Sequence, residues 1–311
     1  MREPEWFKLE LEDWAAFDFG YELDLRSLIP HILALQEYKA AGLVRALPPY
    51  WLETPQTAGG SGEVGNTLPW GAYAVGAASD PGAGAAPGDA QIPVVTTAKA
   101  RHWIRQRFVP GSAALSLSDI LTLHGMVAEE RGVTGPTAGQ LRTDRVKVGR
   151  AEVGGVHQGA PWQSLPDLMA RYIHFVDSAD LRSLPAVIQA LLAHFFLDTI
   201  HPFIDGNGRT SRLVAAAILS RHGYNLHGTY ALIGYFYRHQ TRYHAMLHAI
   251  WKRSPFAVTP FIAFGMVGFV LELKSIDTFI KMKLNRLRDP VLAASAWRRR
   301  LRPCGGSTER P

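Results

Sequence analysis

The chain has 311 residues, of which 47% are hydrophobic and 19% are charged, and its formal net charge is +6. This composition is typical of a globular protein and excludes a disordered or fibrous chain. The length is enough for one large or two small domains with a buried core. Because Cys304 is the only cysteine, no intramolecular disulfide can form, and we expect a reducing, cytoplasmic setting.

The first part of the chain, residues 1–75, is predicted to form an N-terminal helical layer. Leucine and isoleucine recur at helical spacing between residues 22 and 47, and Pro30 stands near the beginning of this pattern. The acidic first residues lack the apolar stretch of a signal peptide, so we expect none. Residues 76–93 are rich in glycine, alanine and proline, and we expect a flexible linker there.

The following region, residues 94–273, is predicted to be the folded core. Helices are expected over residues 93–108 and 116–130, from residue 164 onward, and over residues 186–200. Ser116 with Asp119, and Ser164 with Asp167, fit capping boxes, in which side chains satisfy the free N–H groups of a helix start. The last of these segments is apolar on nearly every face, which predicts a buried central helix.

Three further features belong to this core. Residues 145–149 alternate in polarity and are predicted to pair with residues 153–157 in a small β-hairpin. Residues 256–271 carry no charge, but they are short for a membrane span, so we expect a buried core helix. His194 is expected to be a satisfied core histidine rather than a ligand, because no cysteine or histidine cluster completes a zinc site.

The chain is organised around residues 201–212, which have the sequence HPFIDGNGRTSR. They separate two apolar segments, the second of which starts at Leu213. Glycine and asparagine favour a tight turn with positive φ angles, so this segment is predicted to be a loop that leads into the N-terminus of a helix. Successive N–H groups in such a loop form an anion-binding nest, here at Gly206, Asn207 and Gly208.

Four side chains of the same segment complete a site for phosphate chemistry. Arg209 and Arg212 lie three residues apart on one side of the first helical turn, where two guanidinium groups can grip a polyphosphate. Asp205 supplies a carboxylate beside the phosphates, which suits Mg²⁺. His201 stands before the loop, where a neutral imidazole can take a proton from an incoming hydroxyl. Each residue alone is more often structural, but the combination indicates phosphate transfer.

This segment resembles the HPFx[DE]GNGRxxR signature of the Fic family and matches all of its fixed positions. The similarity extends over roughly residues 94–273. It implies an all-α fold, a Fic-type helical bundle with a small β-hairpin flap, and a nucleotidyltransferase that moves AMP from ATP to a Ser, Thr or Tyr hydroxyl of a target protein. By this resemblance His201 is the general base and Asp205 holds Mg²⁺. The family's phosphate-binding positions fall on Gly206, Asn207, Gly208, Arg209 and Arg212.

The resemblance leaves alternatives for the reaction. They are removal of AMP from a modified protein, transfer of another nucleotide, and a regulatory role in which the nucleotide is bound without turnover. The intact His201 favours turnover, and the unchanged glycine-asparagine-glycine run at 206–208 favours a nucleotidyl donor. Tyr243 is a candidate contact to the nucleotide base, although a tyrosine at helical spacing is more often part of the core.

The family resemblance also implies partners. In the family the hairpin is a flap that holds the target by strand addition, which predicts a target protein bound along residues 145–157. An ordinary surface hairpin is the alternative. A homodimer is a further candidate assembly, and we expect neither a membrane nor nucleic acid as a partner. The N-terminal layer resembles the accessory region of many Fic proteins, and a packing layer without a role in chemistry is the alternative.

Residues 274–311 are predicted to be a basic C-terminal helix and tail. From residue 281 onward, nine lysines and arginines stand against two acidic residues, so the positive charge of the chain is local. A solvated tail is one interpretation, and contact of the segment from Trp297 with nucleic acid or an acidic partner is the alternative. Too few residues remain for the winged-helix domain that many Fic proteins carry after the core.

A regulatory prediction concerns Glu63. Many family members carry an inhibitory helix of the pattern [ST]xxxE[GN], whose glutamate pairs with the second arginine of the signature, here Arg212. Residues 61–68 resemble it, but Val64 occupies the glutamate position, and Glu63 lies one residue, or about 100° of helix, away. We therefore expect Glu63→Gly to raise self-modification by less than about threefold. A tenfold gain would identify Glu63 as the inhibitory glutamate after all.

Overall fold

The computed structural model describes residues 6–7, 14–40, 92–129, 137–148, 156–224, 235–236, 239–252 and 255–288. The predictions for Glu63, for the glycine-rich linker up to residue 91 and for the tail beyond residue 288 lie outside the described residues. The same holds for the tip of the predicted hairpin, residues 149–155.

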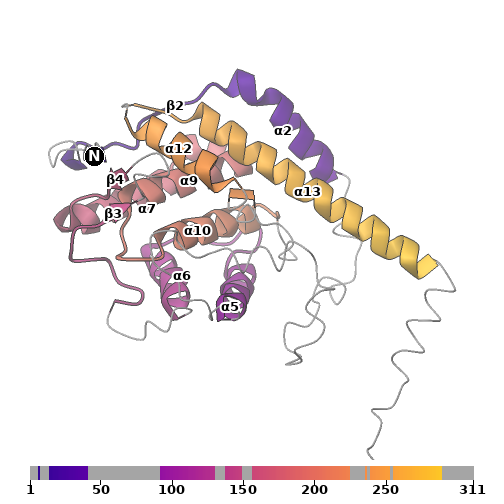
Figure 1. The fold of residues 1–311 in the computed structure, drawn as a ribbon, viewed down its shortest axis with the longest axis horizontal. Coiled ribbons are helices and arrows are strands. Elements are labelled where there is room, and N and C mark those ends of the chain that lie inside the picture. Colours follow the sequence, from indigo (N-terminus) through magenta and orange to yellow (C-terminus); the bar gives the residue numbers. More distant parts are fainter. Residues whose placement is uncertain are drawn as a thin grey trace, which may run out of the picture.

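The described part of the chain is mostly helical, which confirms the predicted fold class (Figure 1). The helices are α2 (Leu25–Ala40), α5 (Ile92–Arg107), α6 (Leu117–Glu129), α7 (Leu165–Asp177), α8 (Ala179–Ser183), α9 (Ala186–Ile200), α10 (Asn207–Arg221), α12 (Gln240–Trp251) and α13 (Thr259–Arg288), with a 3₁₀ turn, η3, at Trp162–Ser164. The strands are β1 (Trp6–Phe7), β2 (Tyr21–Glu22), β3 (Lys147–Val148), β4 (Val156–Gln158) and β5 (Phe256–Ala257).

Helix α9 is the centre of the bundle, as its apolar sequence predicts. Every residue from Val187 to Ile200 is buried. Helix α10 packs along α9, α5 and α6 pack against α10, and α13 crosses α9 from the other side (Figure 1). Gly265 permits this crossing, because a Cβ atom there would lie 2.5 Å from Leu191 Cδ2. The burial of α9 on all sides fixes the place where its C-terminal end, and therefore His201, must lie.

The N-terminal layer shares the core of the bundle. Helix α2 lies along α13 (Figure 1), and Trp14, Phe17 and Phe19 belong to the buried apolar cluster. The predicted helix over residues 22–47 begins late, at Leu25, because Tyr21 and Glu22 form β2, which pairs in parallel with β5. Residues far apart in the sequence thus close one side of the core.

Two of the predicted helix starts have different outcomes. The capping box at Ser116 is confirmed, since Asp119 Oδ2 accepts from the Ser116 N–H at 2.9 Å and Ser116 Oγ accepts from the Asp119 N–H at 3.2 Å. The box predicted at Ser164 is wrong, because Ser164 makes no side-chain capping bond at the start of α7. The preceding turn η3 already holds Ser164 at φ −87° and ψ −9°, whereas a capping residue needs an extended backbone.

The predicted hairpin is confirmed in its paired part. Strands β3 and β4 are antiparallel, with Lys147 opposite Gln158 and Val148 opposite His157. Strand β1 adds to the other edge of β4 in parallel, which the sequence analysis did not predict.

The uncharged segment 256–271 forms strand β5 and the buried first part of α13, so the helix predicted there begins three residues late, at Thr259. Within the described ranges, none of the helices combines the length and low charge needed to cross a bilayer.

Candidate functional site

The residues of the HPFIDGNGRTSR segment lie where α9 ends and α10 begins. His201 follows the last residue of α9 with φ 54° and ψ 62°, and Gly206 precedes α10 with φ 77°. The prediction that the asparagine and both glycines share a positive-φ turn is wrong, because α10 already begins at Asn207. The left-handed backbone of His201 was not predicted, although Pro202 disfavours a helical conformation in the residue before it.

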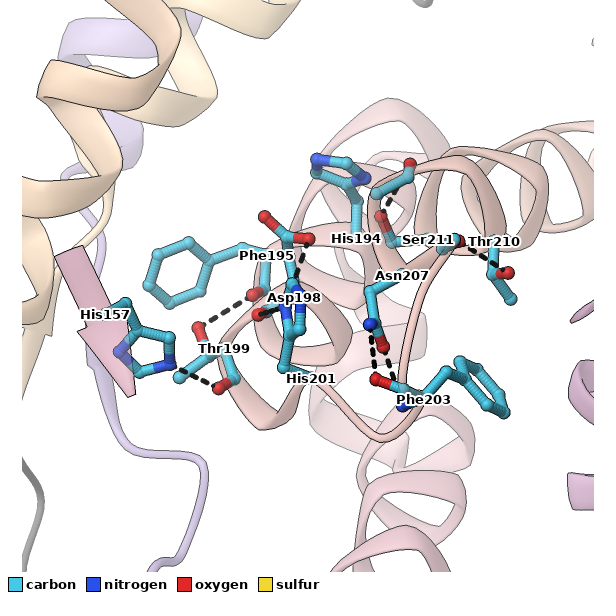
Figure 2. A network of polar contacts seen from close by, with 12 residues as sticks. His157, His194, Phe195, Asp198, Thr199, His201, Phe203, Asn207, Thr210 and Ser211 are labelled. Carbon is cyan, nitrogen blue, oxygen red and sulfur yellow. Dashed lines mark hydrogen bonds and ion pairs between the residues drawn. The ribbon is translucent and has the colours of Figure 1, made fainter. Parts of the chain in front are cut away.

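The loop between the two helices is held in place by Phe203 and Asn207. The Asn207 side chain accepts from the Phe203 N–H at 2.8 Å and donates to the Phe203 carbonyl at 2.7 Å (Figure 2). The Phe203 ring is buried in the core and stacks on His124 with the ring centroids 3.8 Å apart. Asn207 therefore fixes the loop through its side chain while its N–H group belongs to the helix start.

His124 is a site residue that the motif does not reveal. Its Nδ1 accepts from the Gly139 N–H at 3.0 Å, so its proton is on Nε2, which donates to the Asp205 carbonyl at 3.1 Å. Burial lowers the pKa of His124, which keeps this ring neutral and its proton on the nitrogen that holds Asp205. The position of the Asp205 backbone is thus fixed from helix α6.

His201 has the tautomer and the charge state that a general base needs. Its Nδ1 lies 3.0 Å from the Asp198 carbonyl, which can only accept, so Nδ1 carries the proton and Nε2 carries the lone pair. Burial lowers the pKa of His201 to about 4, helped by the positive charge of Arg142 and opposed by the Asp198 hydrogen bond and the charge of Asp205. At neutral pH the imidazole is therefore uncharged and able to take a proton.

A polar network continues from Asp198 into the core through Tyr243 and His194. The Tyr243 hydroxyl lies 3.3 Å from Asp198 Oδ2 and 2.7 Å from His194 Nε2. Tyr243 is buried in this network, so it is a core tyrosine and does not face a nucleotide base. His194 is the satisfied core histidine that was predicted, and burial, with the charge of Arg212, lowers its pKa to about 3.

The two arginines of the segment differ in their surroundings. Arg209 is buried, and its Nη2 lies 3.5 Å from Asp205 Oδ2. Arg212 is partly buried, and its Nε atom has no hydrogen-bond partner within the described ranges of the chain. Both project from the first turns of α10, whose first N–H groups are those that an α-helix leaves unsatisfied. The N-terminal end of α10 thus combines the N–H groups of its first turn, the positive end of the helix dipole and guanidinium groups, as an anion site requires.

Asp205 suits the predicted magnesium ion. Its carboxylate is 38% exposed and stands at the positive end of α10. Mg²⁺ in phosphate-transfer sites usually takes one or two carboxylates and completes its shell with phosphate oxygens and water. The described residues contain no group of three or more acidic, histidine or cysteine side chains placed to hold a metal. Asp205 would therefore hold the ion together with a bound nucleotide.

A separate cavity of about 400 Å³ lies at the opposite end of α9. Gln189 and His222 line it and hydrogen bond to each other at 3.1 Å, and its other walls come from α2, the end of α8, the start of α9, Tyr224 and Met266 of α13. Helix α9 has 15 residues, which places this cavity roughly 20 Å from His201. It is therefore not part of the site at the segment 201–212.

These positions predict a loss of nucleotide affinity in two variants. Arg212→Ala and Asp205→Ala should each weaken binding of ATP with Mg²⁺ by about tenfold or more, because each removes a charged contact to phosphate or metal. Arg182→Ala is the matched control, since Arg182 pairs with Asp177 at the other end of α9. Calorimetry that finds unchanged affinity in both variants would place the phosphates elsewhere.

The part of the chain that carries this site is similar to known proteins. Residues 114–219 match the model of the Fic/DOC family. Over 111 residues, 35% of this chain, the sequence is 42% identical to "Protein adenylyltransferase Fic" of Drosophila mojavensis and 44% identical to the protein of the same name in Drosophila grimshawi. The matched region spans about a fifth of the length of these relatives (20% and 21%).

Solved structures agree in fold. A Fic family protein from Desulfovibrio desulfuricans superposes with a TM-score of 0.61 at 17% identity, over 81% of this chain and 74% of that one. Fic-1 from C. elegans superposes with a TM-score of 0.56 at 18% identity, over 83% of this chain and 75% of the other. The matched residues 114–219 include α9 and all but the end of α10, the two helices that carry the site, so this part of the chain is a Fic/DOC domain.

Proposed function

We propose that this protein is a nucleotidyltransferase that moves AMP from ATP to a Ser, Thr or Tyr hydroxyl of a target protein. The observation that carries the proposal is the neutral His201, whose Nδ1 is held by Asp198 while Nε2 carries a lone pair beside the N-terminus of α10. A general base and an anion site that are joined by one short loop suit the attack of a hydroxyl on a bound phosphate. The names of the two Drosophila relatives support the same activity.

The reaction would be an in-line displacement at the α-phosphorus of ATP. His201 Nε2 takes the hydroxyl proton as the oxygen forms its bond to phosphorus, and the bond to pyrophosphate breaks on the opposite side. The negative charge of the bound polyphosphate raises the pKa of the imidazole, which makes it a stronger base when substrate is present. The N–H groups at the start of α10 and the guanidinium of Arg212 stabilise charge that grows on the phosphate oxygens. Mg²⁺ at Asp205 would supply positive charge beside the leaving group.

The target would lie along the hairpin, residues 145–157. Within the described residues, β4 has β3 on one side and β1 on the other, so β1 and β3 are the two edge strands of this sheet, and β3 is the one that belongs to the hairpin. An extended target segment would therefore add to β3, where backbone groups face away from β4. A location in the cytoplasm, and action without a membrane or nucleic acid, remain predictions from the sequence.

Two forms of labelled ATP test the proposal. With Mg²⁺ and a lysate as the source of targets, label at the α-phosphate should be transferred to protein, and label at the γ-phosphate should not. Transfer from both forms or only from the γ-position would indicate another chemistry. Nucleotide binding in calorimetry with no transfer in either arm would favour the non-catalytic, regulatory alternative, and loss of label from a modified protein would favour AMP removal.

A further inference from the structure

The end of α9 is held by an unusual set of hydrogen bonds. Four successive carbonyls, those of residues 199–202, accept from one neighbouring region of the chain, at distances from 2.6 to 3.0 Å. The donors are His157 Nε2 to Thr199 at 2.6 Å, the Ala160 N–H to Ile200 at 3.0 Å, Arg142 Nε to His201 at 2.8 Å and the Arg142 N–H to Pro202 at 3.0 Å. The carbonyls of Thr199 and Ile200 are groups that the end of α9 leaves unsatisfied, and those of His201 and Pro202 follow directly, so the region around the hairpin caps α9 and holds the start of the motif loop.

Arg142 is at the centre of this cap. Its side chain is 5% exposed, and its three guanidinium nitrogens donate to the carbonyls of His201, Asp144 and Ala160. The described part of the structure places no carboxylate in an ion pair with it, and burial lowers the pKa of Arg142 to about 10. A buried cation bonded only to neutral acceptors is costly, which indicates a role beyond packing.

The hairpin, Arg142 and the catalytic histidine also touch at Gly159. A Cβ atom at position 159 would lie 2.9 Å from Val146 Cγ1, 3.0 Å from Arg142 Nη2 and 3.0 Å from His201 Cβ. The fit is too close for any larger residue without displacement of one of these groups. A change at Arg142 is therefore transmitted directly to His201.

We propose that Arg142 is a positioning residue, which holds His201 in its left-handed backbone conformation and joins the hairpin to the loop of the active site. This inference rests on the proposed function of His201 as the general base. A residue other than glycine in this conformation is strained, by about 1–2 kcal/mol, and needs a neighbouring contact to hold it. The hydrogen bond from Arg142 Nε to the His201 carbonyl is that contact. The partial negative charge at the C-terminal end of α9 attracts the guanidinium and strengthens the bond.

The charge of Arg142 has a second effect on the same imidazole. The groups that face His201 are Asp198 from α9, Asp205 from the motif loop, His157 from β4 and Arg142 from the segment before β3. Asp205 raises the pKa of His201, whereas Arg142 lowers it. Removal of the guanidinium charge should therefore raise this pKa, and replacement by lysine should leave it nearly unchanged.

The test compares Arg142→Gln with Arg142→Lys. For Arg142→Gln we expect kcat for AMP transfer to fall by about 30-fold or more while KM for ATP changes by less than about threefold, because the N-terminus of α10 does not contact Arg142. Arg142→Lys should retain part of kcat, because it keeps the charge and one donor. The matched control is Arg171→Gln, since Arg171 also donates to backbone carbonyls, those of Trp14 and Phe17, far from the motif. The control should keep wild-type kcat.

A measurement without turnover separates this inference from the proposed function. In the metal-free and nucleotide-free protein, NMR titration of the labelled His201 ring should show a higher pKa in Arg142→Gln than in wild type and in Arg142→Lys. If wild type transfers no nucleotide, the proposed function fails, and the titration still decides the role of Arg142. An unchanged His201 titration together with kcat within threefold of wild type in Arg142→Gln would overturn the inference.

Discussion

The variant His201→Ala should lose nucleotide transfer, with a fall in rate of about 10²–10⁴-fold, and should keep its affinity for ATP within about threefold. The reason is that His201 Nε2 acts on the proton of the attacking hydroxyl, which matters in the transition state. A neutral imidazole adds little to binding of the nucleotide in the ground state. Single-turnover transfer from α-labelled ATP and calorimetry of ATP binding measure the two quantities.

A second histidine provides the control for this variant. His174 is exposed on α7, so His174→Ala should leave both transfer and affinity unchanged. Loss of ATP binding in His201→Ala would show that the imidazole contacts the nucleotide and would contradict its assignment as the base. Transfer at the wild-type rate would contradict the mechanism itself.

Acidification should destabilise the fold strongly, because burial holds several imidazoles in their neutral form and lowers the pKa of three of them far below the ordinary value. Burial lowers the pKa of His157 and His194 to about 3 and that of His201 to about 4. The unfolded chain binds these protons near the ordinary pKa of about 6.5, so the unfolded state gains protons first as the pH falls. The free energy of unfolding should therefore be constant above about pH 7 and decrease as the pH falls from 6.5 toward 4.

The expected size of this effect is large. At pH 5 each of these imidazoles lowers the free energy of unfolding by up to about 2 kcal/mol. The sum for three groups is comparable with the whole free energy of unfolding of a typical domain. Urea unfolding at pH 7.5, 6 and 5 measures it. The variant His194→Gln keeps a donor for Tyr243 without a titrating ring, and its stability should fall less steeply with pH. Equal unfolding midpoints at pH 7.5 and 5 in the wild-type protein would show that these imidazoles are accessible to protons in the native state.

The sequence predicted what depends on local pattern and residue type. The position of α9 follows from its mostly apolar sequence between Pro185 and the motif, and the segment 201–212 carries the chemistry of the site in its residue types. The hairpin followed from alternation over a few residues. The prediction failed where a neighbouring turn competed, as at Ser164, whose backbone is already helical in η3.

The supporting contacts of the site depend on residues distant in the sequence. His124 reaches the Asp205 carbonyl from 81 positions away, and Arg142 reaches the His201 carbonyl from 59 positions away. Helical and strand periodicity carry no information about such pairs, since they report only which face of an element is buried. Pro202 was a local indication that His201 would leave the helical conformation. The residue type histidine gives no indication of a left-handed backbone.

The pairing of β2 with β5 has a consequence for how the chain folds. The Asp24 N–H donates to Thr259 Oγ1 across 235 positions, and Phe17 packs on Phe256 with ring centroids 6.0 Å apart. Closing a loop of this length costs entropy before any contact is gained, so the N-terminal layer should dock after the bundle of α9 and α10 has formed. During synthesis, the contact of Phe17 with Phe256 and the bond from Asp24 to Thr259 cannot form until β5 and the start of α13 have left the ribosome. The slowest step of folding should therefore be the docking of the N-terminal layer on the helical bundle.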